Sequence, residues 1–377
     1  MSHHHDHTHD HSHTHQTGKK YKISLSIILA LCLGYSFFAI KNQPQINDQN
    51  QKAVSAEVQE VTDYGDERME LTLKIDSGEE KGKQITVVED QSLYLNRREF
   101  KVGDEVVLQQ DLNPENSAGY YISDYKRTGV LMGLAFLFIL TVIIITGWQG
   151  IGSVVGLLLS FIILFNITLP LILNGTNPIT AAILSAVLII PATFYSSHGM
   201  SKKTTIAAIS TIATLIFAGL LATFFAKLGN LTGLSSEEAS YLQVETAEKI
   251  NFKGLLLSGM LLGLLGVLDD ITISQASIVK QLKGANPNIS KSELYSRAMS
   301  VGRDHISSMV NTLILIYAGS ALPLLLLFVD YAQPLNQILN IEPVAEEVIR
   351  TLVGSVGLIL AVPVTTMLAI AVYHKKK

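Results

Sequence analysis

The feature that most constrains this chain is a series of long apolar stretches, each close to the length a helix needs to cross a lipid bilayer. A helix of about 20 residues spans the hydrocarbon core and satisfies its own backbone hydrogen bonds there. Eight such stretches follow one another, at residues 23–40, 129–148, 151–173, 179–195, 204–226, 254–268, 309–328 and 352–372. The sequence therefore predicts a mainly α-helical integral membrane protein with about eight transmembrane helices.

Composition agrees with a membrane protein and removes several other classes. The chain has 377 residues, of which 48% are hydrophobic and 16% charged, and its formal net charge is -4. The net charge is too small to favour nucleic acid as a partner, and the chain has no basic stripe. The lipid bilayer is therefore the expected environment. The single cysteine, Cys32, excludes an intramolecular disulfide and a thiolate metal cage.

The motifs give no reason to expect an enzyme. The chain lacks a nucleotide-binding loop, a Ser/His/Asp set and a zinc-protease motif. An intramembrane aspartyl protease needs two aspartates at one depth on different helices. Asp269 and Asp270 end one apolar stretch, whereas Asp330 falls at the far end of another, about a membrane thickness away. This arrangement argues against a protease.

Residues 1–22 form a histidine-rich tail, for which two interpretations stay open. Alternating imidazoles in a flexible chain can hold zinc, nickel or copper weakly. The alternative is an expression tag or a disordered tail with incidental affinity, and no other cofactor is expected. The metal-ligand candidates are His3, His4, His5, His7, His9, His11, His13 and His15.

Residues 41–127 interrupt the apolar pattern and predict a small all-β domain of about five strands. Apolar residues alternate with polar ones around positions 54–58, 71–75 and 85–87. Turns that contain Gly65, Gly78 or Gly103 fall among these runs. The pattern is typical of a barrel-like, OB-like domain, and it implies no ligand.

Lysine and arginine bias predicts how the chain sits in the cell membrane. The stretch 23–40 is expected to be an uncleaved anchor, because lysines precede it and no small-x-small cleavage site follows it. Basic residues collect in alternate loops, among them Lys202, Lys203 and the tail 374–377. We therefore expect both termini in the cytoplasm, an extracytoplasmic β domain, and a seven-helix membrane domain over residues 128–373.

A polar segment, residues 271–307, is predicted to be a cytoplasmic amphipathic helical hairpin that lies on or under the inner membrane surface. Residues 284–288 end the first helix of the hairpin. Ser290 and Glu293 then form a capping box that begins the second helix. The residues expected on the buried side of that second helix are Leu294, Ala298 and Val301.

The most informative charges stand at the two ends of this segment. Asp269 and Asp270 sit where the negative end of a helix dipole disfavours carboxylates, so they need compensation. Arg303 and His305 are the nearest candidates, at the same expected depth. One interpretation is a hydrated ion pair that pins two helices, and the other is a protonatable or cation-binding cluster. The coupling or transport candidates are Asp269, Asp270, Gln275, Arg303, Asp304, His305, Asn311 and Thr312.

Two proline-containing sequences predict kinks inside membrane helices. Asn166 precedes Pro170 in one apolar stretch, and Pro363 precedes two threonines in the last one. We interpret both as packing features, because proline and hydroxyl residues are common in membrane spans.

The runs GLLGVLDDITISQASIVKQLKGANP and VGRDHISSMVNTLILIYAGSALPLLLLF resemble the YibE/F family of bacterial multi-pass membrane proteins. The resemblance implies an integral membrane protein without an established substrate. The leading span and β domain fit a YibE-type arrangement, and we expect a second YibF-like membrane subunit or a homo-oligomer. A weaker likeness in the order of elements points to SecD/SecF and the RND permeases. The residues that carry the family resemblance are Gly266, Asp269, Asp270, Gln275, Ala276, Gly302, Arg303, Asp304, His305, Asn311, Ala318, Gly319 and Pro323.

The sequence supports one main functional hypothesis and keeps two alternatives. The first is a transporter, or the membrane subunit of one, of unknown substrate and coupled to protons through the charged set. The alternative is a non-transporting membrane scaffold that binds partners and whose charges only pin helices. A further alternative is metal-ion export or sensing through the histidine-rich tail.

Overall fold

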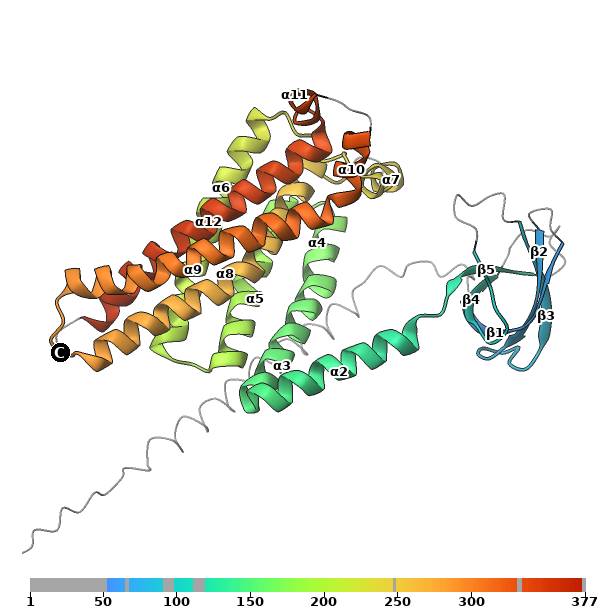
Figure 1. The fold of residues 1–377 in the computed structure, drawn as a ribbon, viewed down its shortest axis with the longest axis horizontal. Helices are drawn as coiled ribbons and strands as arrows, with labels where there is room; N and C mark the ends of the chain where they lie inside the picture. Colours follow the sequence, from blue (N-terminus) through green and yellow to red (C-terminus); the bar gives the residue numbers. More distant parts are fainter. Residues whose placement is uncertain are drawn as a thin grey trace, which may run out of the picture. The chain divides into compact units, whose positions relative to one another are not determined.

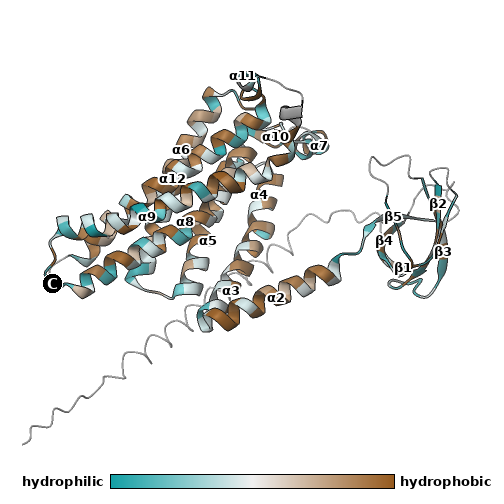
Figure 2. Ribbon diagram, in the orientation of Figure 1, coloured by the Kyte–Doolittle hydropathy of each residue, from teal (hydrophilic) through white to brown (hydrophobic). Residues whose placement is uncertain are grey.

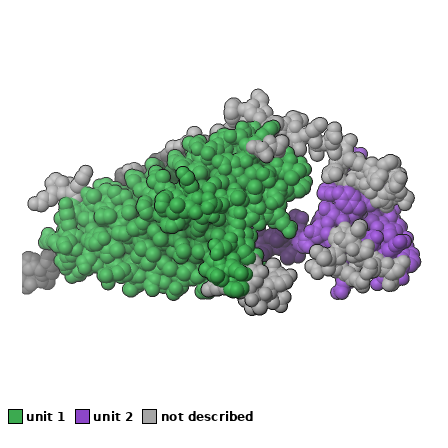
Figure 3. Space-filling model, turned by 90° about the horizontal axis from the view of Figure 1, so that it is seen from above, with its two compact units in different colours: residues 1–42, 145–377 green, residues 43–144 purple. Residues whose placement is uncertain are grey.

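The computed structural model describes residues 53–64, 68–90, 98–110, 119–246, 249–330 and 334–374. The chain divides into two compact units, one over residues 43–144 and the other containing residues 145–377 (Figure 3). The predicted histidine-rich tail, the predicted first span at 23–40 and residues 375–377 lie outside the described residues.

The first unit contains an antiparallel sheet of five strands in the order β3-β2-β1-β4-β5 (Figure 1). Edge strands β3 and β5 come into contact, so the sheet curves into a partly open barrel, as the sequence predicts. The extracytoplasmic location of this sheet stays a prediction. The strands are β1 (Val54–Asp63), β2 (Arg68–Ile75), β3 (Gln84–Asp90), β4 (Glu105–Gln110) and β5 (Tyr120–Tyr125).

Alternation of apolar and polar residues builds the core of the sheet. The inward side chains of β1, β2 and β3 are buried, which confirms the three alternating runs read from the sequence. The turn before β4 contains Gly103 at φ 93°, a left-handed conformation that favours glycine. The buried residues are Val54, Ala56, Val58, Leu71, Leu73, Ile75, Ile85, Val87, Phe100, Val106, Leu108 and Ile122.

Six helices among the described residues are long and apolar enough to cross a membrane, and four of them match predicted spans to within about three residues at each end. The fifth of the six, α8, extends well beyond its predicted end. The last of the six, α12, begins at Glu342, well before the predicted start of its span at residue 352. Figure 2 shows that hydrophobic residues make up most of these helices. They are α2 (Thr128–Thr146), the run of α3 (Trp148–Ile163), η2 (Leu164–Thr168) and α4 (Leu169–Leu173), then α5 (Pro178–His198), α6 (Lys202–Leu228), α8 (Phe252–Ala285) and α12 (Glu342–Tyr373).

One predicted span is divided in two. The stretch 309–328 is shared between α9 (Lys291–Ser320) and α10 (Leu322–Asp330), which meet at Ala321. Pro323 has no backbone N–H to donate to the carbonyl four residues earlier, and its ring clashes with that carbonyl, so α9 ends before it. The predicted total of eight spans is therefore not confirmed. Two short helices, α7 (Glu237–Thr246) and α11 (Leu335–Ile338), lie in the connecting segments.

The predicted amphipathic segment is continuous with long helices. Helix α8 runs without a break to Ala285, and α9 restarts at Lys291 after the predicted interruption. The Ser290 hydroxyl accepts the backbone N–H of Glu293 at 3.2 Å, which confirms the predicted helix cap. Leu294 and Ala298 are buried as predicted. The prediction for Val301 was wrong, because this residue is exposed.

The kink predicted at Pro170 takes the form of a π-helical turn, η2. Proline removes one backbone donor, and the ladder of hydrogen bonds lengthens by one residue before it. Within this turn the Thr168 hydroxyl lies 2.6 Å from the Ser185 hydroxyl of α5, and both side chains are buried. The turn therefore joins α3 and α5 through a polar contact inside an apolar region.

Helices α3 to α6, α8, α9 and α12 pack side by side and form what we call the bundle. Its helices begin at capped positions, including Asn177, Ser201 and Asn251. We call one end the lysine end, because His198, Lys203 and Lys280 lie there. The other is the glutamate end, where α8 and α12 begin and the loop 229–236 meets Glu342 and Glu346.

Candidate functional site

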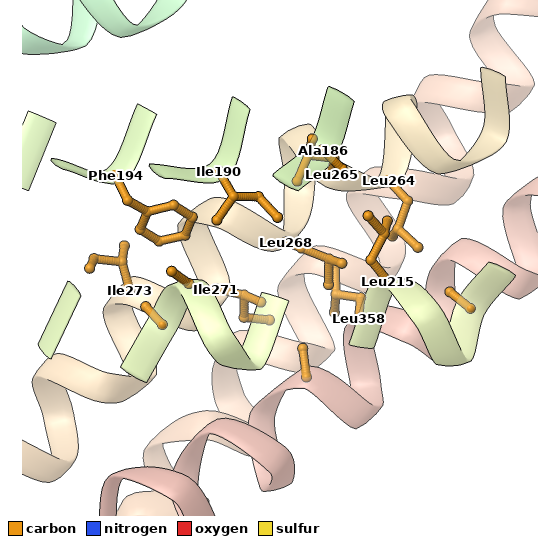
Figure 4. Close-up of a cluster of buried hydrophobic side chains, with 14 of the residues drawn as sticks. Ala186, Ile190, Phe194, Leu215, Leu264, Leu265, Leu268, Ile271, Ile273 and Leu358 are labelled. Carbon is orange, nitrogen blue, oxygen red and sulfur yellow. The ribbon is translucent and has the colours of Figure 1, made fainter. Parts of the chain in front are cut away.

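Helix α8 is the central element of the bundle, packed against α5, α6, α9 and α12. Figure 4 shows Leu268 and Ile271 of α8 among side chains of α5, α6 and α12, and all of these residues are buried. Because neighbours cover α8 on several sides, polar residues on it can meet groups from four different helices. This placement makes the polar positions of α8 the natural place to search for a site.

The contacts of α8 fix the depth of its acidic residues. Helix α5 runs parallel to α8, with Pro178 beside Gly254 and Thr193 bonded to Asp269. At 1.5 Å per residue, Asp269 lies about 22 Å along α8 from Gly254 and about 16 Å from Lys280 at the lysine end. The sequence placed this aspartate at a membrane boundary. That placement stays a prediction, and α8 continues past Asp269 to Ala285.

Asp269 receives one hydrogen bond from a threonine of α5. The Thr193 hydroxyl lies 3.1 Å from Asp269 Oδ2, and it also lies 3.0 Å from the carbonyl oxygen of Ile189 and 3.2 Å from that of Ile190. A hydroxyl has one proton to donate, so these three acceptors compete for it. Asp269 Oδ1 is buried and has no hydrogen-bond partner among the described residues.

A second polar contact lies one turn further along α8. The hydroxyls of Thr272 and Thr211 of α6 are 2.8 Å apart, and both residues are completely buried. Each also lies close to a carbonyl oxygen of its own helix, at 2.9 Å for Thr272 and 3.0 Å for Thr211. Because the pair has two protons for these three contacts, one hydroxyl donates to its partner and the other donates to a carbonyl of its own helix. The contact joins α6 to α8 next to Asp269.

Gln275 joins three helices at the next turn. Its side-chain nitrogen donates to the Ala298 carbonyl of α9 at 3.1 Å and to the Thr366 hydroxyl of α12 at 2.7 Å. Gly302 leaves room for this junction, because a Cβ atom there would lie 2.5 Å from Val362 and 3.0 Å from Gln275 Oε1. The sequence named Gln275 as a candidate, and the structure places it at the meeting point of α8, α9 and α12.

The remaining predicted residues are not brought together. Arg303 and Asp304 are exposed on α9, His305 is half-buried, and no ion pair among the described residues joins Asp269 or Asp270 to Arg303 or His305. Gly302 faces Gln275, so Arg303 stands about 9 Å along the helices from the level of Asp269. The predicted hydrated ion pair is therefore absent.

The other three candidates lie on exposed surfaces. Asp270 is exposed on α8 and comes within electrostatic range of His198. Asn311 and Thr312 are exposed on α9, and the Thr312 hydroxyl bonds the Ser308 carbonyl of its own helix at 3.0 Å. Arg303, Asp304, Asn311 and Thr312 are all exposed on α9, and we call these four residues the polar stripe.

Sequence reasoning missed the threonines that hold the site together. Thr193 and Thr211 stand within apolar stretches without a distinguishing motif, and only packing shows that they face α8. Thr272 follows Asp269 by three residues, a spacing that places two side chains on one helix face and could have drawn attention to it. Thr366 was noticed beside Pro363 but was interpreted as a packing residue.

The structure offers no metal centre in the described part of the chain. Among those residues, no group of three or more His, Cys, Asp or Glu side chains is placed to hold a metal ion. The histidines proposed as metal ligands, from His3 to His15, lie outside the described residues. Their role stays a prediction.

Comparisons with known proteins place the bundle in a family. Neither the curated protein sequences nor the solved structures gave a match. The weaker likeness to SecD/SecF therefore stays a prediction. A family model described as YibE/F-like protein matches residues 134–375, which cover every helix of the bundle and the residues around Asp269 and Gln275. The chain therefore belongs to the YibE/F-like protein family.

Proposed function

We propose that this membrane protein is a proton-coupled transporter, or the membrane subunit of one, in which Asp269 takes up and releases the proton. The supporting observation is the contact between Asp269 and Thr193, whose single hydroxyl proton has three competing acceptors. An ionised Asp269 accepts that proton. A protonated Asp269 instead donates to the Thr193 oxygen, and the threonine turns its own proton to the Ile189 carbonyl.

The surroundings of Asp269 favour a change of protonation over a permanent charge. An aspartate near the centre of a membrane helix costs about 3 kcal/mol on insertion scales, and an unpaired buried charge costs more. No cation compensates Asp269 among the described residues, and its Oδ1 atom has no partner. Binding a proton removes the charge, and the protonated carboxyl then donates to the Thr193 oxygen.

Two prolines provide places where helices can respond to that change. Pro191 lies inside α5 two residues before Thr193, and Pro363 lies inside α12 three residues before Thr366. A proline inside a helix removes one backbone hydrogen bond and lowers the resistance to bending at that point. A proton-dependent bond between α5 and α8 is then able to alter the angle of α5.

The proposal is tested in cells that lack the native protein and express the wild type, Asp269→Asn, Thr193→Val or the exposed control Glu245→Gln at equal membrane levels. We expect the wild type and the control to change the content of at least one solute or ion. Asp269→Asn and a protonophore should each abolish that change, and Thr193→Val should weaken it. A change that survives Asp269→Asn or the protonophore contradicts proton coupling, and no change in any solute contradicts transport.

The polar stripe on α9 favours a partner subunit. Arg303 and Asp304 are exposed, and so is Asp270 on the neighbouring α8, although lipid is a poor solvent for all three side chains. We infer that a second membrane subunit covers this stripe.

The lysine end is assigned to the cytoplasm, because Lys202, Lys203 and Lys280 gather there.

Cross-linking tests the partner subunit. Ser307→Cys, on the exposed side of α9, is introduced into a Cys32→Ser background, with Ile209→Cys on the apolar outside of α6 as the matched control. Photolysis of a maleimide-benzophenone attached to each single thiol in native membranes should give a discrete cross-linked species from position 307 and none from position 209. A thiol at 307 that reacts with charged reagents but never cross-links indicates a water-lined surface and contradicts the partner.

A further inference from the structure

A second buried carboxylate lies at the glutamate end of the bundle. Glu346 of α12 is 7% exposed, and its Oε2 atom accepts the hydroxyl of Ser235 at 2.5 Å. Its Oε1 atom is buried and has no hydrogen-bond partner among the described residues. The acid therefore has one hydroxyl ligand and one unpartnered oxygen, as Asp269 does on α8.

The loop 229–236 covers this carboxylate. Glu342, one turn before Glu346, accepts the backbone N–H groups of Thr232 and Gly233 and the Thr232 hydroxyl, the last at 2.8 Å. Gly233 packs so closely on the start of α8 that a Cβ atom would lie 2.4 Å from the Phe252 carbonyl oxygen. Glu342 thus fixes the loop through backbone groups, whereas Glu346 contacts the loop through the Ser235 hydroxyl and lies within hydrogen-bond reach of the Glu342 carboxyl.

A cation and a phenol lie one turn further into the bundle. Arg350 pairs with Glu347 at 3.0 Å, and the Nε atom of Arg350 is buried without a partner in the described region. Arg350 and Tyr317 of α9 line a cavity of about 10 Å³ that also touches α6 and α8. That volume is about the space one water molecule occupies, and the cavity has polar groups to bind it.

Buried hydroxyls continue from this cavity toward Asp269. Thr214 of α6 and Ser355 of α12 are buried, and their hydroxyl oxygens have no hydrogen-bond partner in the described structure. Helices α8 and α12 run parallel, because Leu264 contacts Gly357 and Gln275 bonds Thr366. This register places Glu346 near the level of Gly254, about 22 Å along the bundle from Asp269.

We propose that Glu346 is a second proton-binding site, which exchanges protons with the solution at the glutamate end. Glu346 Oε1 binds a proton from water on that side and releases it to the water site beside Tyr317 and Arg350, from which the Asp269 carboxyl is supplied. One proton enters and one leaves, so the charge balances over a cycle. The charged groups that act most strongly on Glu346 are Glu342 and Arg350, both on α12.

This inference rests on the proposed proton-coupled function, and the test separates the two. Infrared spectra of the full-length protein in lipid bilayers report protonated carboxyl groups through their C=O stretch, followed across a pH titration. The variants are Asp269→Asn, Glu346→Gln and the exposed α7 control Glu238→Gln. We expect one band to be lost in Asp269→Asn, a different band to be lost in Glu346→Gln, and both bands to persist in the control.

The other outcomes separate the second site from the proposed function. If Glu346→Gln removes no band while Asp269→Asn does, the second site is overturned and the proposed function stands. If only Glu346→Gln removes a band, the role of Asp269 fails instead. Ser235→Ala keeps the acid and removes its hydrogen-bond donor, so it should shift the Glu346 band in frequency even if Glu346→Gln does not fold. An unshifted band in Ser235→Ala also overturns the second site.

Discussion

The sheet and the bundle treat polar groups in opposite ways. Inside the sheet nearly all of the buried side chains are apolar, and the charged ones pair on its surface, as Arg127 does with Asp124 at 2.7 Å. Inside the bundle, threonines, serines, Gln275 and Glu346 are buried, while large apolar residues such as Leu220 face outward. The same chain thus has one unit with a dry core and another with polar groups along its interior.

The difference follows from the solvent that each unit meets. Water drives apolar side chains into the core of a sheet. Lipid provides no such force between helices, so small and polar residues at helix contacts supply the attraction. In the bundle, a hydroxyl pair such as Thr211 with Thr272 therefore takes the place that leucines occupy in the sheet.

The largest effect is expected from a core residue of the sheet. Leu73 of β2 is 0% exposed, and Leu73→Ala leaves a cavity that should lower the free energy of unfolding by about 2–5 kcal/mol. Amide exchange along β1 and β2 measures this loss. Val88→Ala on β3 is the matched control, because Val88 is 61% exposed and its loss should have little effect. Equal effects at the two positions would show that the sheet has no dry core.

Overpacking the Gln275 junction should have the next largest effect. A methyl group at Gly302 would meet the stiff side chain of Val362 at 2.5 Å, so Gly302→Ala should destabilise the bundle by about 1–3 kcal/mol. Thermal unfolding of the detergent-solubilised protein measures the change. Gly319→Ala, also on α9 but with open space around it, should be neutral or stabilising. A stable Gly302→Ala variant would mean that α8, α9 and α12 are not tightly joined there.

Local sequence patterns predicted the elements well, because local chemistry decides them. The period of two in β1 and β2 gave the strands, apolar length gave most of the helices, and Ser290 gave a helix start. Pro323 explains why the predicted span 309–328 divides at Ala321. Counting apolar residues could not predict this division, because the count ignores the effect of proline on a helix. The sequence was therefore reliable where the cause lies within a few residues.

The site was only partly predictable, because it depends on how helices are rotated and aligned. Successive residues on a helix point about 100° apart, so Asp269 turns toward α5 while Asp270 is exposed. The predicted pairing with Arg303 assumed that both helix ends stop at one surface. In fact α8 and α9 continue past each other, and Arg303 lies level with Gln275. No local pattern reports that alignment.

The polar bonds of the bundle should contribute less than its packing. Gln275→Leu removes the bonds to Ala298 and Thr366, and we expect a loss of about 1 kcal/mol, since hydrogen bonds between membrane helices average about 0.6 kcal/mol. A double-mutant cycle with Thr366→Val in thermal unfolding isolates the pair. Strict additivity of the two variants would rule out the bond as a source of stability.

The smallest effect is expected from the exposed pair on the sheet. The hydrogen bond from Arg127 holds the pKa of Asp124 below its usual range, helped by the backbone N–H of Tyr125. A lowered pKa stabilises the fold above the unfolded pKa, and that stability is lost as pH falls through the folded pKa. Between pH 7 and pH 2.5 the urea midpoint of the sheet should therefore fall slightly more in the wild type than in Asp124→Asn. Concentrated salt should shrink this difference, because both side chains are in water. A difference as large as that of Leu73→Ala would instead mean that charge stabilises the sheet as strongly as its core does, and the contrast with the bundle would then fail.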